Sequence, residues 1–343
     1  MQKRTYKILD LVFIFTSLCL VGFLFWQFGS DSTTWFSSEK TEEKSAEKKP
    51  AYIDKLTGIG TDNFEDSNPV PLAIMIDNHP EAFPISGLNE AKVIYEAPVE
   101  GNMTRFMAIF AQNQTANKVG PVRSARPDYL DWAQEYGIPL YMHCGGSPDA
   151  LSRLKTERGL IDFNEFYNGS YFWRDSTRLA PHNLYTSSSL WQSAWEKYGK
   201  ESFWQSFTFG QNNSTTPAVE IEVAYSGNFK VGWKYNYLKK NYERYFRGEK
   251  FLDDKNDPIF AQTIIIVKNK TKVLDEVGRL SIYNIGSGDA YILSGGRMIK
   301  GQWRKSKAEF RTRFYDDFGA ELSVPPGKIW FMSVPTEKEI TIN

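Results

Sequence analysis

The chain has 343 residues, of which 41% are hydrophobic and 15% aromatic, so it can bury a large core. Basic and acidic residues balance at 41 each, and this even charge excludes the strongly basic class of proteins, so we expect no nucleic-acid partner. The two cysteines, Cys19 and Cys144, are not expected to form a disulfide, because Cys19 lies inside an apolar N-terminal run.

The N-terminal apolar run has the length of a membrane span. It extends from Leu11 to Trp26 with further apolar residues on both sides, and about 20 such residues cross the hydrocarbon core as a helix. Basic residues precede it and Asp31 is the first charge after it, which favours a cytoplasmic N-terminus. We predict a cytoplasmic tail and transmembrane anchor over residues 1–28, a single-pass topology in the cell membrane, and an extracytoplasmic C-terminal bulk. The alternative is a cleaved signal peptide with a weak site at Ser30-Asp31-Ser32.

A polar tether and a mixed domain are predicted next. Residues 29–68 carry many charges and few apolar side chains, which predicts a disordered tether. Between residues 69 and 212, short apolar runs alternate with helical patterns, which favours an α/β domain with a mixed sheet and helices. The expected strands are 71–77, 93–99, 104–111 and 139–144, and the expected helices are 128–136, a helix starting near 148, and 187–199.

A mostly antiparallel β domain is predicted for the last part of the chain, residues 217–343. Alternating runs follow one another closely and are separated by glycine-rich turns, as in hairpins. The expected strands are 219–225, 229–236, 241–247, 263–269, 278–285, 289–294 and 328–335. The predicted fold is thus an α/β domain followed by a β-rich domain, after one transmembrane helix.

Arginines and histidines concentrate in the first domain, near the predicted ends of strands. Residues 120–126 read GPVRSAR and place Arg123 and Arg126 three positions apart at an expected helix start, where we expect them to face the same way. Guanidinium groups grip phosphate or carboxylate through two parallel hydrogen bonds, and helix N-termini favour anions. The segment therefore indicates an anion site. The alternative is that both arginines pair with acids such as Glu96, Glu100 or Asp128.

Two further segments carry polar residues in predicted loops. His143 and Cys144 end a strand before Gly145 and Gly146, and Cys144 is expected to be a packed side chain rather than a nucleophile. An aromatic loop over residues 166–183 is expected to pack down as a lid or wall. The three histidines have sequence spacings that match no compact metal-ligand pattern, so neither a metal nor another cofactor is expected.

At these motifs the sequence resembles the YerB-like family of bacterial surface proteins. The resemblance covers residues 56–335 and rests on motifs that include Leu56 to Gly58, Ile76 to Pro80, Thr104 to Phe106, Gly120 to Arg126, His143 to Pro148, Phe172 to Asp175, Pro181 to Thr186, Tyr242 to Arg244 and Pro326 to Trp330. It implies a two-domain extracytoplasmic protein and brings no established activity. The chain departs from the lipoprotein members because Leu18, which is not small, precedes Cys19.

Three functions remain open from the sequence. The first is binding of an anionic cell-wall component or a lipid-linked phosphate in an arginine and histidine cleft. The second is phosphotransfer or hydrolysis of such a lipid-linked phosphate, by analogy with the layout of the LytR-Cps2A-Psr phosphotransferases, with Asp77 on magnesium; catalytic residues are not assigned. The third is a scaffold for a protein partner. The candidate ligand-binding residues are Asp77, Asn78, His79, Glu96, Arg105, Arg123, Ser124, Arg126, His143, Gly145, Gly146, Ser147, Arg174, Asp175, His182 and Asn183.

Overall fold

The computed structural model describes residues 49–211 and 213–343, and the predicted membrane segment within residues 1–28 lies outside them. In the described part of the chain, no helix is long and apolar enough to cross a membrane. The longest described helix, α6 (Ser188–Tyr198), has 11 residues, whereas a span needs about 20. The predicted architecture that included a transmembrane helix is therefore corrected: the described fold consists of sheets and short helices.

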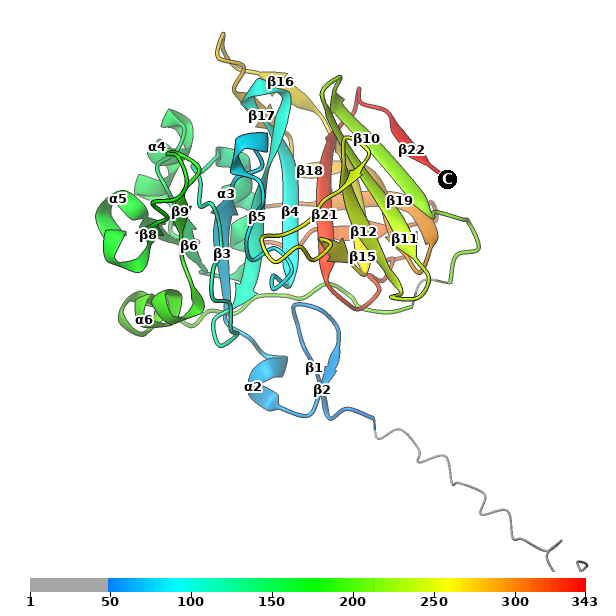
Figure 1. The fold of residues 1–343 in the computed structure, drawn as a ribbon. Helices are drawn as coiled ribbons and strands as arrows, with labels where there is room; N and C mark the ends of the chain where they lie inside the picture. The colour runs from blue at the N-terminus through cyan, green and yellow to red at the C-terminus, as the bar shows by residue number, and fades with distance from the viewer. Residues whose placement is uncertain (1–48, 212) are drawn as a thin grey trace, which may run out of the picture. The chain divides into compact units, whose positions relative to one another are not determined.

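A ten-stranded mixed sheet forms the centre of the described fold (Figure 1). Its strand order is β20 (Arg313–Tyr315), β19 (Arg297–Lys305), β18 (Gly286–Ser294), β15 (Thr263–Asn269), β21 (Ile329–Pro335), β4 (Val93–Val99), β5 (Met103–Ala111), β3 (Pro71–Ile76), β6 (Leu140–His143) and β7 (Ile161–Asn164). Strands β3, β4 and β21 are buried along their whole length, as expected for apolar runs covered on both faces.

The two predicted domains share this sheet. Strand β21, from the last part of the chain, pairs in parallel with β15 on one side and with β4 on the other, in the register Ile329 with Val93. Residues 50–343 accordingly form one compact unit. The mixed strands with helices in the first half and the antiparallel strands in the second half are present, but they meet through β21 and β4 as neighbours.

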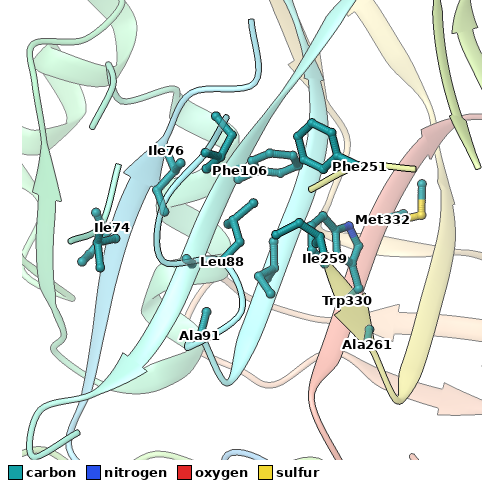
Figure 2. Packing of buried hydrophobic residues seen from close by; sticks show 14 of the residues in the cluster. Ile74, Ile76, Leu88, Ala91, Phe106, Phe251, Ile259, Ala261, Trp330 and Met332 are labelled. Atoms are coloured by element: carbon teal, nitrogen blue, oxygen red, sulfur yellow. The ribbon is translucent and has the colours of Figure 1, made fainter. Parts of the chain in front are cut away.

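A second sheet packs against one face of the first. It is antiparallel, with the order β13 (Glu249–Lys250), β12 (Asn241–Phe246), β11 (Phe229–Asn236), β10 (Glu220–Ser226) and β22 (Ile340–Ile342), and with β14 (Phe260–Ala261) paired to β12. Strands β10 and β11 alternate buried and exposed residues, and Trp233 meets Trp330 of β21 with ring centroids 4.9 Å apart. Figure 2 shows Phe251, Ile259 and Ala261 gathered beside Trp330 in this layer.

Helices cover much of the remaining surface of the large sheet. Helix α3 (Pro127–Ala133) and the 3₁₀ turn η3 (Gln134–Tyr136) bury their aromatic side chains against the opposite face, where Trp132 stacks on Tyr95 of β4. Helices α4 (Pro148–Thr156), α5 (Glu165–Asn168) and α6 lie near β6, with the short hairpin of β8 (Trp173–Arg174) and β9 (Leu184–Tyr185) (Figure 1).

Most strands predicted from the sequence lie where expected, but one predicted run is mostly not strand and several strands were not predicted. The runs 93–99, 229–236 and 263–269 coincide with β4, β11 and β15. The run 278–285 instead contains only the short strand β17 (Leu280–Ile282), which pairs with β16 (Thr271–Val273) outside the large sheet. The sequence pattern also missed β19, whose run RMIKGQWRK is largely polar, and the short strands β7, β20 and β22, which have too few residues to show a period.

The end of the predicted tether is ordered rather than disordered. Residues 50–68 contain β1 (Tyr52–Ile53), β2 (Gly60–Thr61) and α2 (Phe64–Ser67). Leu56 is buried in the core, and the Asp54 carboxylate accepts hydrogen bonds from the Leu56 amide and the Thr57 hydroxyl, each at 2.8 Å. Gly58 turns the chain with a φ of +71°, which favours glycine. One buried leucine and this turn offset the polar composition of the segment.

A buried ion pair joins the two sheets. Glu96 on β4 and Arg244 on β12 both have fully buried side chains, and Arg244 donates to Glu96 Oε1 at 2.7 Å. Trp330 Nε1 donates to the other carboxylate oxygen at 2.8 Å, and the Thr104 hydroxyl donates to Oε1 at 2.7 Å. The Arg244 guanidinium also lies over the rings of Phe251, Phe106 and Trp330. Glu96 was predicted to contact a ligand, but its fully buried side chain has a structural role instead.

Replacement of Arg244 should destabilise the protein strongly. Arg244→Met leaves the Glu96 carboxylate buried without its cation, and breaking such a pair costs about 3–5 kcal/mol. The free energy of unfolding, measured by urea denaturation with tryptophan fluorescence, should fall by that amount. Arg247→Met is the matched control, because the exposed Arg247 side chain donates to the Asn228 carbonyl and lies over the Phe246 ring. It should cost less than about 1 kcal/mol. Equal losses in both variants would contradict this role of Arg244.

Candidate functional site

A pocket of about 550 Å³ opens at the carboxyl end of β6, the edge where α/β sheets commonly bind ligands. Its walls come from the segment before α3, the turn after β6, helices α4 and α5, strand β8 and the loop before β9. The lining residues are Arg123, Ser124, Cys144, Gly145, Gly146, Leu151, Phe166, Arg174, Ala180 and Pro181. Five of these were predicted site residues: Arg123, Ser124, Gly145, Gly146 and Arg174.

Backbone hydrogen bonds hold the arginine segment at the pocket. The Arg123 amide donates to the Met75 carbonyl of β3 at 2.9 Å, and the Cys144 amide donates to the Arg123 carbonyl at 3.1 Å. The Ala125 amide donates to the Gly145 carbonyl at 3.0 Å. The extended segment is thereby pinned between the ends of β3 and β6. Gly145 has a φ of +63°, and a Cβ there would lie 3.3 Å from the Phe166 ring, so glycine fits the close approach of this wall.

Arg123 reaches the pocket beside a carboxylate that it shares with a histidine. Arg123 Nε lies 3.0 Å from Asp77 Oδ2, and its side chain is partly exposed. The same Oδ2 atom is 2.7 Å from His182 Nδ1, while the His79 amide donates to Asp77 Oδ1 at 3.1 Å. Asp77 is itself buried. The Asp77 carboxylate is thus shared between the Arg123 guanidinium and the His182 ring.

Arg174 is the more exposed cation of the pocket, with 44% of its side chain accessible. It donates to Asn183 Oδ1 at 3.0 Å and lies 3.4 Å from Glu165 Oε1. An exposed ion pair of this kind contributes at most about 1 kcal/mol, so Arg174 can turn to another anion at small cost.

Cys144 lines the pocket but has the properties of a thiol rather than a thiolate. Burial raises its pKa, and the neighbouring Glu165 carboxylate, which accepts from Sγ at 3.5 Å, raises it further. The strand before it turns His143 inward, where the ring is fully buried between the Gly145 carbonyl and Asp162 Oδ1, each at 2.7 Å. His143 is thus structural, and the two neighbours face opposite ways as expected.

Arg123 and Arg126 do not face the same way, contrary to the prediction. Helix α3 starts only at Pro127, and the residues before it are extended. Arg126 pairs with Glu100 on the far side of this segment, as the alternative reading had allowed, and donates also to the Ala125 carbonyl. In an extended segment, successive side chains point to opposite faces. Residues three positions apart, such as Arg123 and Arg126, therefore point in opposite directions.

Other predicted site residues support the structure around the pocket. Asn78 donates to Thr104 Oγ1 at 2.6 Å within the buried Glu96 network. Arg105 donates to the Ser124 carbonyl at 3.1 Å, and burial lowers its pKa to about 10. Ser147 caps α4 through the Ala150 amide. Asp175 pairs with Lys118 at 3.1 Å and accepts from Thr177.

The sequence analysis indicated one apolar wall of the pocket and missed another. Phe166, from the aromatic loop, stands 68% exposed on α5 and forms one wall, while Leu151 on α4 forms another. The loop was expected to form a lid or wall, which gave a signal for Phe166. Leu151 gave none, because a leucine at helical spacing usually indicates core.

Comparison with known proteins gives related matches to family profiles, to a protein sequence and to a solved structure. Two profiles of the family described as "Protein of unknown function (DUF3048)" match in order, the N-terminal domain over residues 56–201 and the C-terminal domain over 221–331. A protein of Bacillus subtilis (strain 168) named "Putative lipoprotein YerB" is 33% identical over 290 residues, which cover 82% of this chain and 85% of that protein. The crystal structure of the YerB protein from Bacillus subtilis matches with a TM-score of 0.75 and 30% identity, covering 84% of this chain and 99% of the other.

The Arg126 and Glu100 pair should make stability depend on acid pH. Burial alone raises the pKa of Glu100, but the hydrogen bond and charge of Arg126 outweigh it and lower the pKa from 4.5 to about 2. A depressed carboxyl pKa stabilises the fold above the unfolded value and loses this effect as pH falls from 4.5 towards 2. Allowing for solvent screening, Glu100→Gln should cost roughly 1–2 kcal/mol at pH 6.

The measurement is the free energy of unfolding of wild type and Glu100→Gln between pH 6 and pH 3. The difference between the two proteins should shrink to less than half over this range. A constant difference would show that the Glu100 carboxylate does not hold its charge through Arg126.

Proposed function

Because the chain belongs to the YerB-like family (DUF3048), as its motifs predicted, we propose that it is a membrane-associated extracytoplasmic protein whose pocket binds an anionic cell-envelope ligand. The observation that carries this proposal is the convergence of Arg123 and Arg174 on one pocket from segments far apart in the chain. The name of the Bacillus relative, which describes a lipoprotein, supports the location.

The chemistry of the walls indicates the class of ligand. Guanidinium groups bind phosphate and carboxylate oxygens through paired hydrogen bonds. Gly145 and Gly146 let a ligand approach the backbone closely, and Phe166, Leu151 and Pro181 offer apolar surface beside the charges. A molecule with an anionic group joined to a sugar or lipid part matches this mixture, as in a lipid-linked phosphate or a cell-wall polymer. The volume lies within the roughly 300–1,000 Å³ of small-molecule sites.

Binding is favoured over phosphotransfer or hydrolysis by the state of the reactive groups. The thiol of Cys144 has a raised pKa, which disfavours the nucleophilic thiolate. Asp77, considered as a magnesium ligand for phosphotransfer, has both carboxylate oxygens engaged, Oδ1 by the His79 amide and Oδ2 by His182 and Arg123. Neither group is poised for the chemistry that the alternative needs.

Loss of either pocket arginine should weaken binding of an anionic ligand. The purified protein is mixed with vesicles that contain a polyprenyl phosphate or with purified teichoic acid, and the bound fraction is measured at low and high salt. Arg174→Ala and Arg123→Ala should each lower the affinity about 10-fold or more, since a charged hydrogen bond contributes about 1.5–3 kcal/mol. High salt should weaken the wild type.

Arg158→Ala is the matched control, because it removes the same charge from an exposed position that does not line the pocket. It should bind as the wild type does. If all three variants bind equally, or if the wild type binds neither probe, the pocket is not an anion site and a scaffold for a protein partner becomes the better account.

A further inference from the structure

A second group of polar side chains lies next to the pocket, on the other side of Asp77. It consists of His79, Glu81 and His182, whose potential ligand atoms all lie within 4.8 Å of one another. His79 follows β3 and caps the 3₁₀ turn η1 (Pro80–Ala82), and His182 lies in the loop that leads to β9. The two imidazole rings stack with centroids 5.0 Å apart and 20° between their planes.

Hydrogen bonds set the tautomers of both rings. A carboxylate oxygen only accepts, so His182 Nδ1 donates its proton to Asp77 Oδ2 at 2.7 Å, which leaves the Nε2 lone pair free in the neutral ring. His79 Nδ1 accepts a hydrogen bond from the Glu81 amide at 3.2 Å, so this nitrogen carries no proton and its lone pair is engaged with that amide. Both nitrogens lie close to the Glu81 carboxylate: Oε2 is 3.4 Å from His182 Nε2 and 3.9 Å from His79 Nδ1.

Nitrogen and carboxylate ligands gathered in this way favour a positive species between them. A proton on His182 Nε2 would satisfy one contact, whereas a metal ion would engage all three ligands once His79 Nδ1 exchanges the Glu81 amide for the ion. Nitrogen and oxygen ligands of tetrahedral zinc, at about 2.0–2.2 Å from the metal, lie about 3.4 Å apart. The distance from His182 to Glu81 already has this value, and His79 and Glu81 have partly or largely exposed side chains that can close the remaining gap.

We propose that His79, Glu81 and His182 form a binding site for a divalent transition metal ion, with zinc as the best match, and that Asp77 orients His182 from behind. Two imidazoles and one carboxylate are ligands that zinc favours, and three protein ligands leave one position for water or an anion. A ligating histidine commonly donates its other ring N–H to a carboxylate, as His182 does to Asp77. Glu81, 75% exposed at its side chain, gives the ion a path from solvent.

The site is connected to the pocket through two routes. Asp77 Oδ2 contacts both His182 and Arg123, and the pocket residues Ala180 and Pro181 directly precede His182. A metal at this position would therefore fix the loop that forms one wall of the pocket. The sequence analysis expected no metal, because the ligands come from loops that are distant in the sequence and are brought together only by the fold.

The test is isothermal titration calorimetry with zinc chloride alone. The purified full-length protein is first freed of metal with a chelator. The wild type should bind one equivalent. His182→Ala should abolish this binding, Glu81→Gln should weaken it at least 10-fold, and Asp77→Asn should weaken it roughly 10–100-fold through loss of orientation. Circular dichroism confirms that each variant is folded.

Two matched controls separate this site from other donors. Glu65→Gln removes an exposed carboxylate in the first turn of α2, and Cys144→Ser removes the pocket thiol; both should bind zinc as the wild type does. Absence of stoichiometric binding, or binding that Glu81→Gln and His182→Ala leave unchanged, would overturn the proposal. Binding of the anionic probes is measured on metal-free protein, so failure of the zinc site does not decide the pocket's role.

Discussion

Glu96 is a carboxylate with no access to water, and its partners come from both halves of the chain. The buried Arg244 guanidinium neutralises it from the second sheet, and Trp330 donates to it from β21. Burying one unpaired charge is far more costly than any single apolar contact, so the two sheets must close together for Glu96 to be buried at all. A second buried carboxylate, Glu135, repeats the arrangement with Lys305 at 2.6 Å and Arg311 at 3.0 Å.

The same network supports the candidate site from inside. Thr104 donates to Glu96, and Asn78 donates to Thr104, which fixes the chain where β3 ends. Asp77 and His79 flank Asn78 in the sequence, so their positions depend on this buried contact. From Asp77 the contacts continue outward to Arg123 in the pocket and to His182 beside it. Polar groups at the surface are thus held by polar groups in the core.

The central strands were predictable because a strand that is buried on both faces has a continuous run of apolar residues in the sequence. Residues 93–99 and 263–269 are examples. It was not predictable that the two halves of the chain share one sheet, since nothing in the apolar run of β21 indicates that β4 is its neighbour. Likewise, the few apolar residues scattered between residues 50 and 68 gave no sign that Leu56 is buried and that this segment folds. Burial is decided by neighbours that are remote in the sequence.

The candidate site was predictable in its residue types and only partly in its geometry. Arg123 and Arg174 were selected because they lie in loops with glycine and proline after strands, and both line the pocket. Arg126 met the same criterion, and Arg105 was selected at the start of an expected strand, but Glu100 holds the first and the Ser124 carbonyl the second inside the structure. A cation free for a ligand cannot be distinguished from a paired one until its partners are placed. The meeting of His79 and His182 was hidden for the same reason.

The central claim is that Arg123 and Arg174 act together on one anion. Nuclear magnetic resonance of the arginine Nε–Hε groups during a titration with inorganic pyrophosphate tests it most directly. The account predicts that the signals of Arg123 and Arg174 shift together along one binding curve, while the signal of exposed Arg158 stays in place. Signals of the pocket arginines that do not move, or that move only as Arg158 does, would contradict it.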